Sequence, residues 1–156
     1  MLHFAPAALA DLQQHALACY PRECVALAFG QGTQVTRVVR LDNMADKLHA
    51  LDPVEYPRTS RDFFAFNEAK AQKQVREAEA QGEAWLALVH SHIDCGAYFS
   101  DEDARYAAPG GQAVYPDLVQ VVIDCRPEGI REARAFRWDG STFAPLAIHP
   151  EFACTR

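Results

Sequence analysis

The chain has 156 residues, 49% hydrophobic and 23% charged, which is typical of one folded domain spanning residues 1–156. Its formal net charge is −6, from 21 acidic and 15 basic residues, and this balance disfavours nucleic-acid binding. Five cysteines without a CxxC pair argue against a disulfide framework. No apolar run approaches the ~20 residues of a membrane span. A cytoplasmic location is therefore expected.

The first predicted elements are a helix and a β-hairpin. Residues 6–19 repeat apolar positions at helical spacing, and the Tyr20-Pro21 pair ends that pattern. Residues 25–29 and 34–41 have the composition of strands, and the turn between them contains Gly30 and Gly32. The expected buried face of the helix consists of Leu9, Leu12, Ala16 and Leu17.

A polar stretch and a long helix are expected next. Residues 42–59 contain two X-Pro pairs and predict an irregular loop that can line a cleft. Ser60 is a suitable N-cap for a helix that runs to about Gln81 and is ended by Gly82. The buried stripe predicted for this helix is Phe64, Ala71, Val75 and Ala78.

The second half of the chain is richer in predicted strands. The apolar run 85–89 indicates a buried strand, and a short helix is expected from Asp101. Three further strands are predicted, the last two joined by an Asp139-Gly140 turn. They cover residues 118–125, 132–138 and 142–148. Helices alternating with strands predict an α/β fold with a mixed sheet flanked by helices.

Three candidate metal ligands lie within fourteen positions. His90 and His92 are two residues apart at the end of a predicted strand, so their imidazoles share one face and can reach one ion. Ser100 is suited to cap the following helix, which places Asp103 in its first turn. His-x-His also occurs by chance, and Ser-x-x-Asp is an ordinary capping box. Together they indicate a catalytic zinc site, in which three protein ligands leave a position for water.

Hydrolysis at such a site also needs a general base. Glu23 precedes the apolar strand 25–29 and offers a carboxylate. In this order and spacing, Glu23, His90-x-His92 and Ser100-x-x-Asp103 resemble the JAMM motif of the JAB1/MPN/Mov34 metalloprotease family. The resemblance covers most of the chain and implies a single MPN domain.

The resemblance also implies a role for each motif residue. Zn²⁺ would be held by His90, His92 and Asp103, Glu23 would be the base, and Ser100 would stabilise the oxyanion. Many family members have a proline after the second histidine and a glycine in the Glu-bearing strand. This chain has Ile93 and Ala26 there, which affects the expected loop geometry rather than the chemistry.

The substrate class follows from the resemblance alone. It implies a peptidase or isopeptidase that cuts after the C-terminal Gly-Gly of a ubiquitin-like protein, with processing of a sulfur-carrier precursor as the first hypothesis. Removal of a ubiquitin-like modifier from conjugates is the alternative, and a non-catalytic MPN scaffold is the competing class. The complete set of motif residues favours an enzyme.

The remaining histidines and cysteines receive structural interpretations. His3, His15, His49 and His149 have no partner at ligand spacing and are expected on the surface or in loops. Cys95 lies in the loop between the metal ligands, where a free thiol is favoured over a fourth ligand. Cys24 alternates to the strand face opposite Glu23 and is expected in the core.

Overall fold

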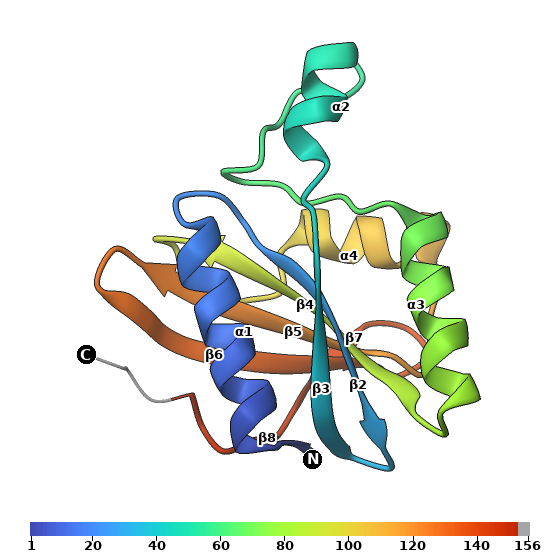
Figure 1. The fold of residues 1–156 in the computed structure, drawn as a ribbon. Coiled ribbons are helices and arrows are strands. Elements are labelled where there is room, and N and C mark those ends of the chain that lie inside the picture. The colour runs from blue at the N-terminus through green and yellow to red at the C-terminus, as the bar shows by residue number, and fades with distance from the viewer. Residues whose placement is uncertain (153–156) are drawn as a thin grey trace.

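The computed structural model describes residues 1–152. Figure 1 shows one sheet with helices packed on it and one helix that projects from the body. In chain order the elements are β1 (Leu2–Phe4), α1 (Pro6–Cys19), β2 (Val25–Gln31), β3 (Gln34–Leu41), α2 (Ala45–Leu51), α3 (Glu68–Ala80), β4 (Ala84–Ile93), α4 (Asp101–Ala107), the 3-10 turn Pro109–Gly111, β5 (Val119–Arg126), β6 (Gly129–Trp138), β7 (Phe143–Leu146) and β8 (Ile148–His149).

Within the described residues, the strands form one eight-stranded sheet in the order β7-β6-β5-β4-β2-β3-β1-β8. The pairs β4–β5, β1–β3 and β1–β8 are parallel, and the other neighbours are antiparallel. The sheet is therefore mixed and flanked by helices, which confirms the predicted α/β class. None of the helices in residues 1–152 has the length and apolar character needed to cross a membrane.

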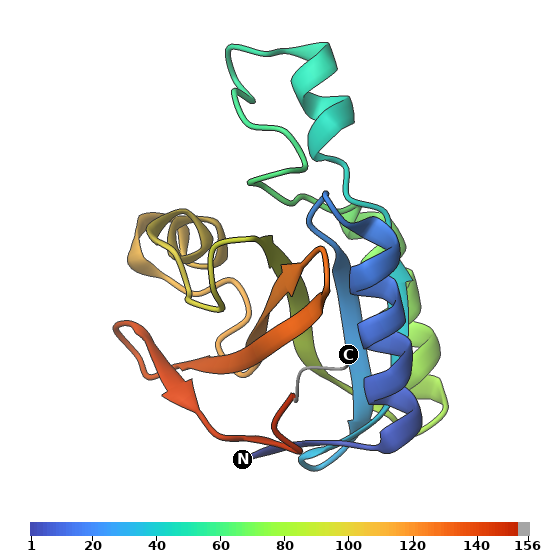
Figure 2. The ribbon, with the colours of Figure 1, turned by 90° about the vertical axis from the view of Figure 1, so that its left-hand side faces the viewer.

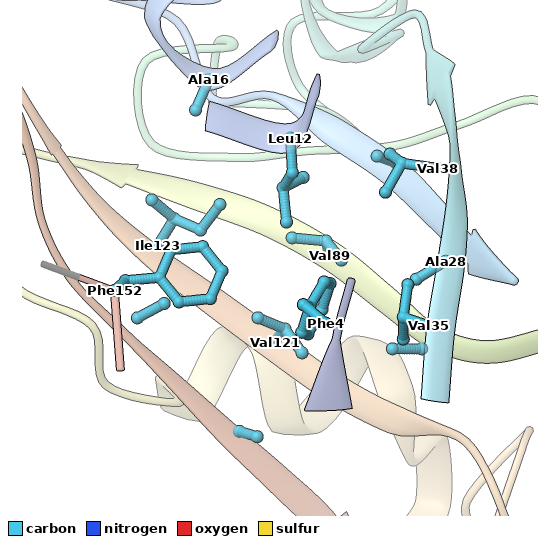
Figure 3. Packing of buried hydrophobic residues seen from close by; sticks show 14 of the residues in the cluster. Phe4, Leu12, Ala16, Ala28, Val35, Val38, Val89, Val121, Ile123 and Phe152 are labelled. Carbon is cyan, nitrogen blue, oxygen red and sulfur yellow. The ribbon is translucent and has the colours of Figure 1, made fainter. Parts of the chain in front are cut away.

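Strand alternation gives the sheet two apolar faces. On β2, Ala26 and Ala28 pack in the cluster that α1 covers, whereas Val25, Leu27 and Phe29 belong to the cluster beside α3. Figure 3 shows Leu12 and Ala16 of α1 above Val89, Val121 and Ile123 of β4 and β5. The histidine-bearing strand β4 is thus held between two packed layers.

The first helix has the predicted bounds but a different buried face. Ala8, Leu12, His15 and Ala16 are its buried residues, whereas Leu17 is 41% exposed. The expectation that His15 lies on the surface is therefore wrong. Its Nε2 lies 2.9 Å from the carbonyl oxygen of Val25, and this hydrogen bond satisfies a polar ring inside the core.

The prediction that a helix begins at Ser60 is wrong, because α3 begins at Glu68. The side chain of Asn67 is the N-cap and accepts a hydrogen bond from the Lys70 N–H. Ser60 does not cap a helix; its N–H and hydroxyl both donate to Asp46. The intervening Phe64 and Phe66 are buried in an extended connection, while Ala71, Val75 and Ala78 form the predicted stripe.

The segment predicted to be irregular, residues 42–59, contains α2. Figures 1 and 2 show α2 and its connections projecting beyond the sheet, and we call residues 42–63 the arm. Leu51 and Val54 are 82% and 90% exposed on it. Two more differences lie at the ends of the chain. The short strand β1 was not predicted, and the predicted strand 142–148 is divided into β7 and β8.

One glycine in the β2–β3 hairpin is required by close packing. A Cβ on Gly30 would lie 1.8 Å from the carbonyl oxygen of Gln34, next to a bulge between Phe29 and Gly30. In contrast, Gly32 has a φ of +58° with nothing within 4 Å of a built Cβ. The first glycine therefore avoids a collision, and the second allows the turn.

We predict that Gly30→Ala lowers the free energy of unfolding by about 1–3 kcal/mol, because the backbone must move to admit the methyl group. Gly32→Asn is the control and should change it by no more than about 0.5 kcal/mol, since asparagine tolerates positive φ. Urea denaturation measures both. Equal effects of the two substitutions would contradict this interpretation.

Candidate metal centre

The two histidines are positioned by β4. Successive side chains of a strand point to opposite faces, so His90 and His92 both project to the α3 side of the sheet. The exposed fraction is 0% for His90 and 4% for His92. Phe64 stacks on His90 with ring centroids 4.3 Å apart and planes 20° apart, which fixes the orientation of the imidazole.

The third candidate ligand comes from the start of α4. Ser100 and Asp103 form the predicted capping box: Ser100 Oγ accepts from the Asp103 N–H at 3.0 Å, and Asp103 Oδ2 accepts from the Ser100 N–H at 3.0 Å. This local pair holds the Asp103 carboxylate toward the histidines. The structural and the metal-binding interpretations of Ser-x-x-Asp are thus compatible in this chain.

The three side chains fit a zinc ion. Nε2 of His92 lies 3.2 Å from Nε2 of His90 and 3.1 Å from Asp103 Oδ2, and Nε2 of His90 lies 3.3 Å from Asp103 Oδ1. Zinc bonds of 2.0–2.1 Å in a tetrahedron give ligand separations of about 3.3 Å. Within residues 1–152 this is the one group of three such side chains that could hold a metal.

The ring nitrogen of His92 that points away from the other two ligands has the hydrogen bond expected of a metal-binding histidine. Nδ1 of His92 lies 3.0 Å from the carbonyl oxygen of Gly96, so this nitrogen carries the proton and Nε2 keeps its lone pair toward the centre. In contrast, Nδ1 of His90 is buried and has no hydrogen-bond partner among the described residues. On the Nδ1 side, the His90 ring is therefore held by packing on Phe64 rather than by a hydrogen bond.

The electrostatics of the triad suit metal binding. Burial works against a charged Asp103, but the neighbouring His90 and His92 and the Ser100 N–H more than offset it and lower the pKa of the carboxyl group. Burial lowers the pKa of His90, which keeps the imidazole neutral. A neutral imidazole at His90 and a carboxylate anion at Asp103 are the forms in which such side chains bind zinc.

The candidate base faces the same cleft. Glu23, His92, Ser100 and Asp103 line a cleft with a volume of about 750 Å³, which also contacts arginines of the arm and of α4. The exposed fraction of Glu23 is 5%. Burial, followed by repulsion from Asp103, raises its pKa to about 9. A carboxyl group with this pKa beside three possible ligands is a candidate for proton transfer.

A serine between the histidines connects β4 to the base. Ser91 points to the opposite face, where its Oγ accepts from the Cys24 N–H at 2.8 Å, and its own N–H donates to the Cys24 carbonyl at 3.2 Å. Sequence reasoning gave Ser91 no role. A polar residue at an inward position of a buried strand requires a hydrogen-bond partner, which was the available signal. Cys24 is buried, as predicted.

The loop from Ile93 to Phe99 forms one side of the cleft. Cys95 is an exposed free thiol that lines the cleft, but it is not grouped with the three ligand atoms, in agreement with the favoured interpretation. The Tyr98 ring packs edge-on to His92 with centroids 4.9 Å apart. Asp94 is exposed and accepts a hydrogen bond from the Tyr20 hydroxyl.

The sequence was also compared with known protein families. A model described as prokaryotic homologs of the JAB domain matches residues 6–139. The chain belongs to this family. The match covers the Glu23 loop, the histidine strand and α4, and so includes the whole site of this JAB domain.

Solved structures agree on the fold. A protein from Desulfitobacterium hafniense, determined in solution, aligns with a TM-score of 0.70 and 21% identity over 95% of this chain and 91% of that protein. A second solution structure, from Salinibacter ruber, gives a TM-score of 0.62 and 20% identity over 99% of each chain. These identities support the fold alone. A search of curated proteins found no match.

The raised pKa of Glu23 predicts how the zinc-free protein responds to pH. The folded pKa of about 9 lies above the ordinary 4.5, so the folded state holds the proton more tightly between these values. Stability contributed by the protonated carboxyl group is complete below about pH 4.5 and is lost as the pH rises toward 9.

We therefore predict that, as the pH rises from 5 to 9, the free energy of unfolding of zinc-free Glu23→Gln protein increases relative to that of zinc-free wild type. The difference in the free energy of unfolding should reach about 1–3 kcal/mol, because glutamine is never charged. Denaturant titrations of both proteins across this range, in the presence of a chelator, give the difference. Parallel pH profiles would contradict the burial of a carboxyl group at this position.

Proposed function

We propose that this JAB domain is a zinc-dependent peptidase that cleaves after the C-terminal Gly-Gly tail of a ubiquitin-like protein. The observation that carries the proposal is a group of three zinc-compatible ligand atoms, two of whose residues, His92 and Asp103, line one cleft together with the buried Glu23. His90, His92 and Asp103 would hold the ion. When bound, zinc would polarise the scissile carbonyl, acidify the attacking water and lower the pKa of Glu23 toward neutrality.

The residues of the chain then divide the proton transfers between them. Glu23 takes a proton from the attacking water and passes it to the leaving amine. Ser100 Oγ already accepts from the Asp103 N–H, so its own hydroxyl proton is available for the developing oxyanion. The aromatic side chains of Phe64 and Tyr98 limit access of water to the two histidines.

The burial of the candidate ligands favours a thin substrate segment. Two buried members of the triad, His92 and Asp103, line an open cleft between the arm and the loop that carries Tyr98. A Gly-Gly tail has no side chains to collide with these walls and can bring its last carbonyl to the ligands. We assign processing of a sulfur-carrier precursor as the reaction, and removal of a modifier from a conjugate uses the same chemistry on an isopeptide bond.

Zinc content tests the ligand assignment. His90→Ala and Asp103→Ala should lose most of about one zinc per chain, because two protein ligands form a poor tetrahedral site. The matched controls are His149→Ala and Asp101→Ala, which replace exposed residues of the same types and should retain it. Glu23→Gln should also retain zinc while turnover falls by about 10²–10⁴. Elemental analysis and a peptidase assay distinguish ligand, base and non-catalytic scaffold.

Substrate specificity is tested with a ubiquitin-like carrier that has a short C-terminal extension. Mass spectrometry should show a cut directly after Gly-Gly. Replacing the second glycine with valine should reduce cleavage by more than about 100-fold, since a branched side chain next to the scissile bond prevents its approach. The valine carrier must remain folded by circular dichroism. Equal cleavage of both carriers would refute the proposed specificity, whatever the zinc content.

A further inference from the structure

The main chain of Glu23 is held by the arm rather than by the sheet. The Glu23 N–H donates to the carbonyl of Ser60 at 2.6 Å, and the Glu23 carbonyl accepts from Asn43 Nδ2 at 3.0 Å. Pairing of β2 with β4 begins two residues later, at Val25 opposite His90. Both polar groups of the Glu23 backbone thus bind residues that are distant in sequence and belong to the projecting segment.

Asn43 binds four main-chain groups. Its Nδ2 donates to the carbonyls of Glu23 and Phe63, each at 3.0 Å. Its Oδ1 accepts from the N–H groups of Ala45 at 3.0 Å and Ala65 at 3.2 Å. One amide side chain therefore binds the Glu23 loop, the start of α2 and the returning end of the arm, and all its donors and acceptors are used.

The other contact of Glu23 is also supported from the arm. Ser60 is 3% exposed, and Asp46 of α2 accepts from its N–H at 2.8 Å and from its hydroxyl at 2.7 Å. These bonds fix the Ser60 peptide, whose carbonyl binds Glu23. We call Asn43, Asp46 and Ser60 the clamp.

The carboxylate of Glu23 depends on this support. The neighbouring charges that shift its pKa act through space, with Asp103 the first among them, and burial disfavours its charged form. A buried carboxylate gains solvation by swinging outward, so a fixed main chain is needed to keep it over the ligands. Cys24, bound to Ser91, fixes the C-terminal side of Glu23, and the clamp fixes the residue itself.

We propose that the clamp positions the base: Asn43, assisted by Asp46 through Ser60, sets where the Glu23 carboxylate lies over the metal ligands. The inference rests on the proposed function for the role of Glu23. Asn43 is a positioning residue, since it acts through the Glu23 main chain. The arm consequently has two tasks, because it lines the substrate cleft with Arg58 and Arg61 and holds the base.

The test variant is Asn43→Asp, which keeps Oδ1 but presents an oxygen to the carbonyls of Glu23 and Phe63. Turnover of the Gly-Gly carrier should fall about 10–100-fold, KM should change less than about 2-fold, and zinc content should stay the same. Asn67→Asp is the matched control. It makes the same change at the cap of α3, where only an oxygen is used, and should retain wild-type turnover.

A double-mutant cycle separates positioning from general destabilisation. If Asn43 acts through the base, Asn43→Asp causes no further loss in Glu23→Gln protein. The same fold loss in both backgrounds would overturn the proposal. Asp46→Ala is a second variant in case Asn43→Asp does not fold, because Asp46 is an exposed residue. It should lower turnover about 3–10-fold in wild type and have no effect in Glu23→Gln protein.

Hydrogen exchange provides a readout that is independent of activity. The Glu23 amide should exchange at least about 10-fold faster in Asn43→Asp than in Asn67→Asp protein, with and without zinc, because repulsion between the new side-chain oxygen and the Glu23 carbonyl displaces this loop and weakens the bond of its N–H to the Ser60 carbonyl. Unchanged exchange would overturn the inference even if no carrier is cleaved. Wild-type turnover in Glu23→Gln protein would instead refute the proposed function, while faster exchange in Asn43→Asp would still support the clamp.

Discussion

Antiparallel pairing of β2 with β4 is the interaction on which the site depends. It sets Val25 opposite His90, and the Cys24–Ser91 bonds extend it by one residue, so the chain reaches the cleft at Glu23. A shift of one residue would turn both histidines to the α1 face, where Leu12 and Ala16 pack. The apolar layers on both sides of β4 specify its register and therefore the position of the candidate ligands.

The candidate site places several polar side chains in the protein interior, where apolar side chains are usual. Four polar side chains are buried here: His90, His92, Asp103 and Glu23. Their mutual contacts do not supply every polar atom with a hydrogen-bond partner, since Nδ1 of His90 has none among the described residues. Such an arrangement costs stability in the metal-free chain, since charged and polar groups lose hydration. Functional sites commonly lower the stability of the ligand-free protein in this way, and ligand binding offsets the loss.

The parts of the structure that were predictable rest on local signals. The alternation of side chains on β4 and the capping box at Ser100 each involve residues only a few positions apart. The sequence therefore predicts which side chains can face one ion. The start of α3 was mispredicted because Ser60 has the chemistry of a cap but binds Asp46, a partner that local sequence cannot reveal. The clamp was missed for the same reason: Asn43 and Glu23 are 20 residues apart, and their contact depends on how the arm returns to the sheet.

The lengths of the loops closed by these contacts imply an order of assembly. The Ser100–Asp103 box closes over three residues, whereas the Asn43–Glu23 bond spans 20 and the Cys24–Ser91 bond spans 67. Closing a longer loop costs more chain entropy, so the start of α4 can form early and the contacts of Glu23 follow once the sheet and the arm are in place. The folding chain thus orders the candidate ligand of α4 first, and the main chain of Glu23 is the last part of the site to take its final position.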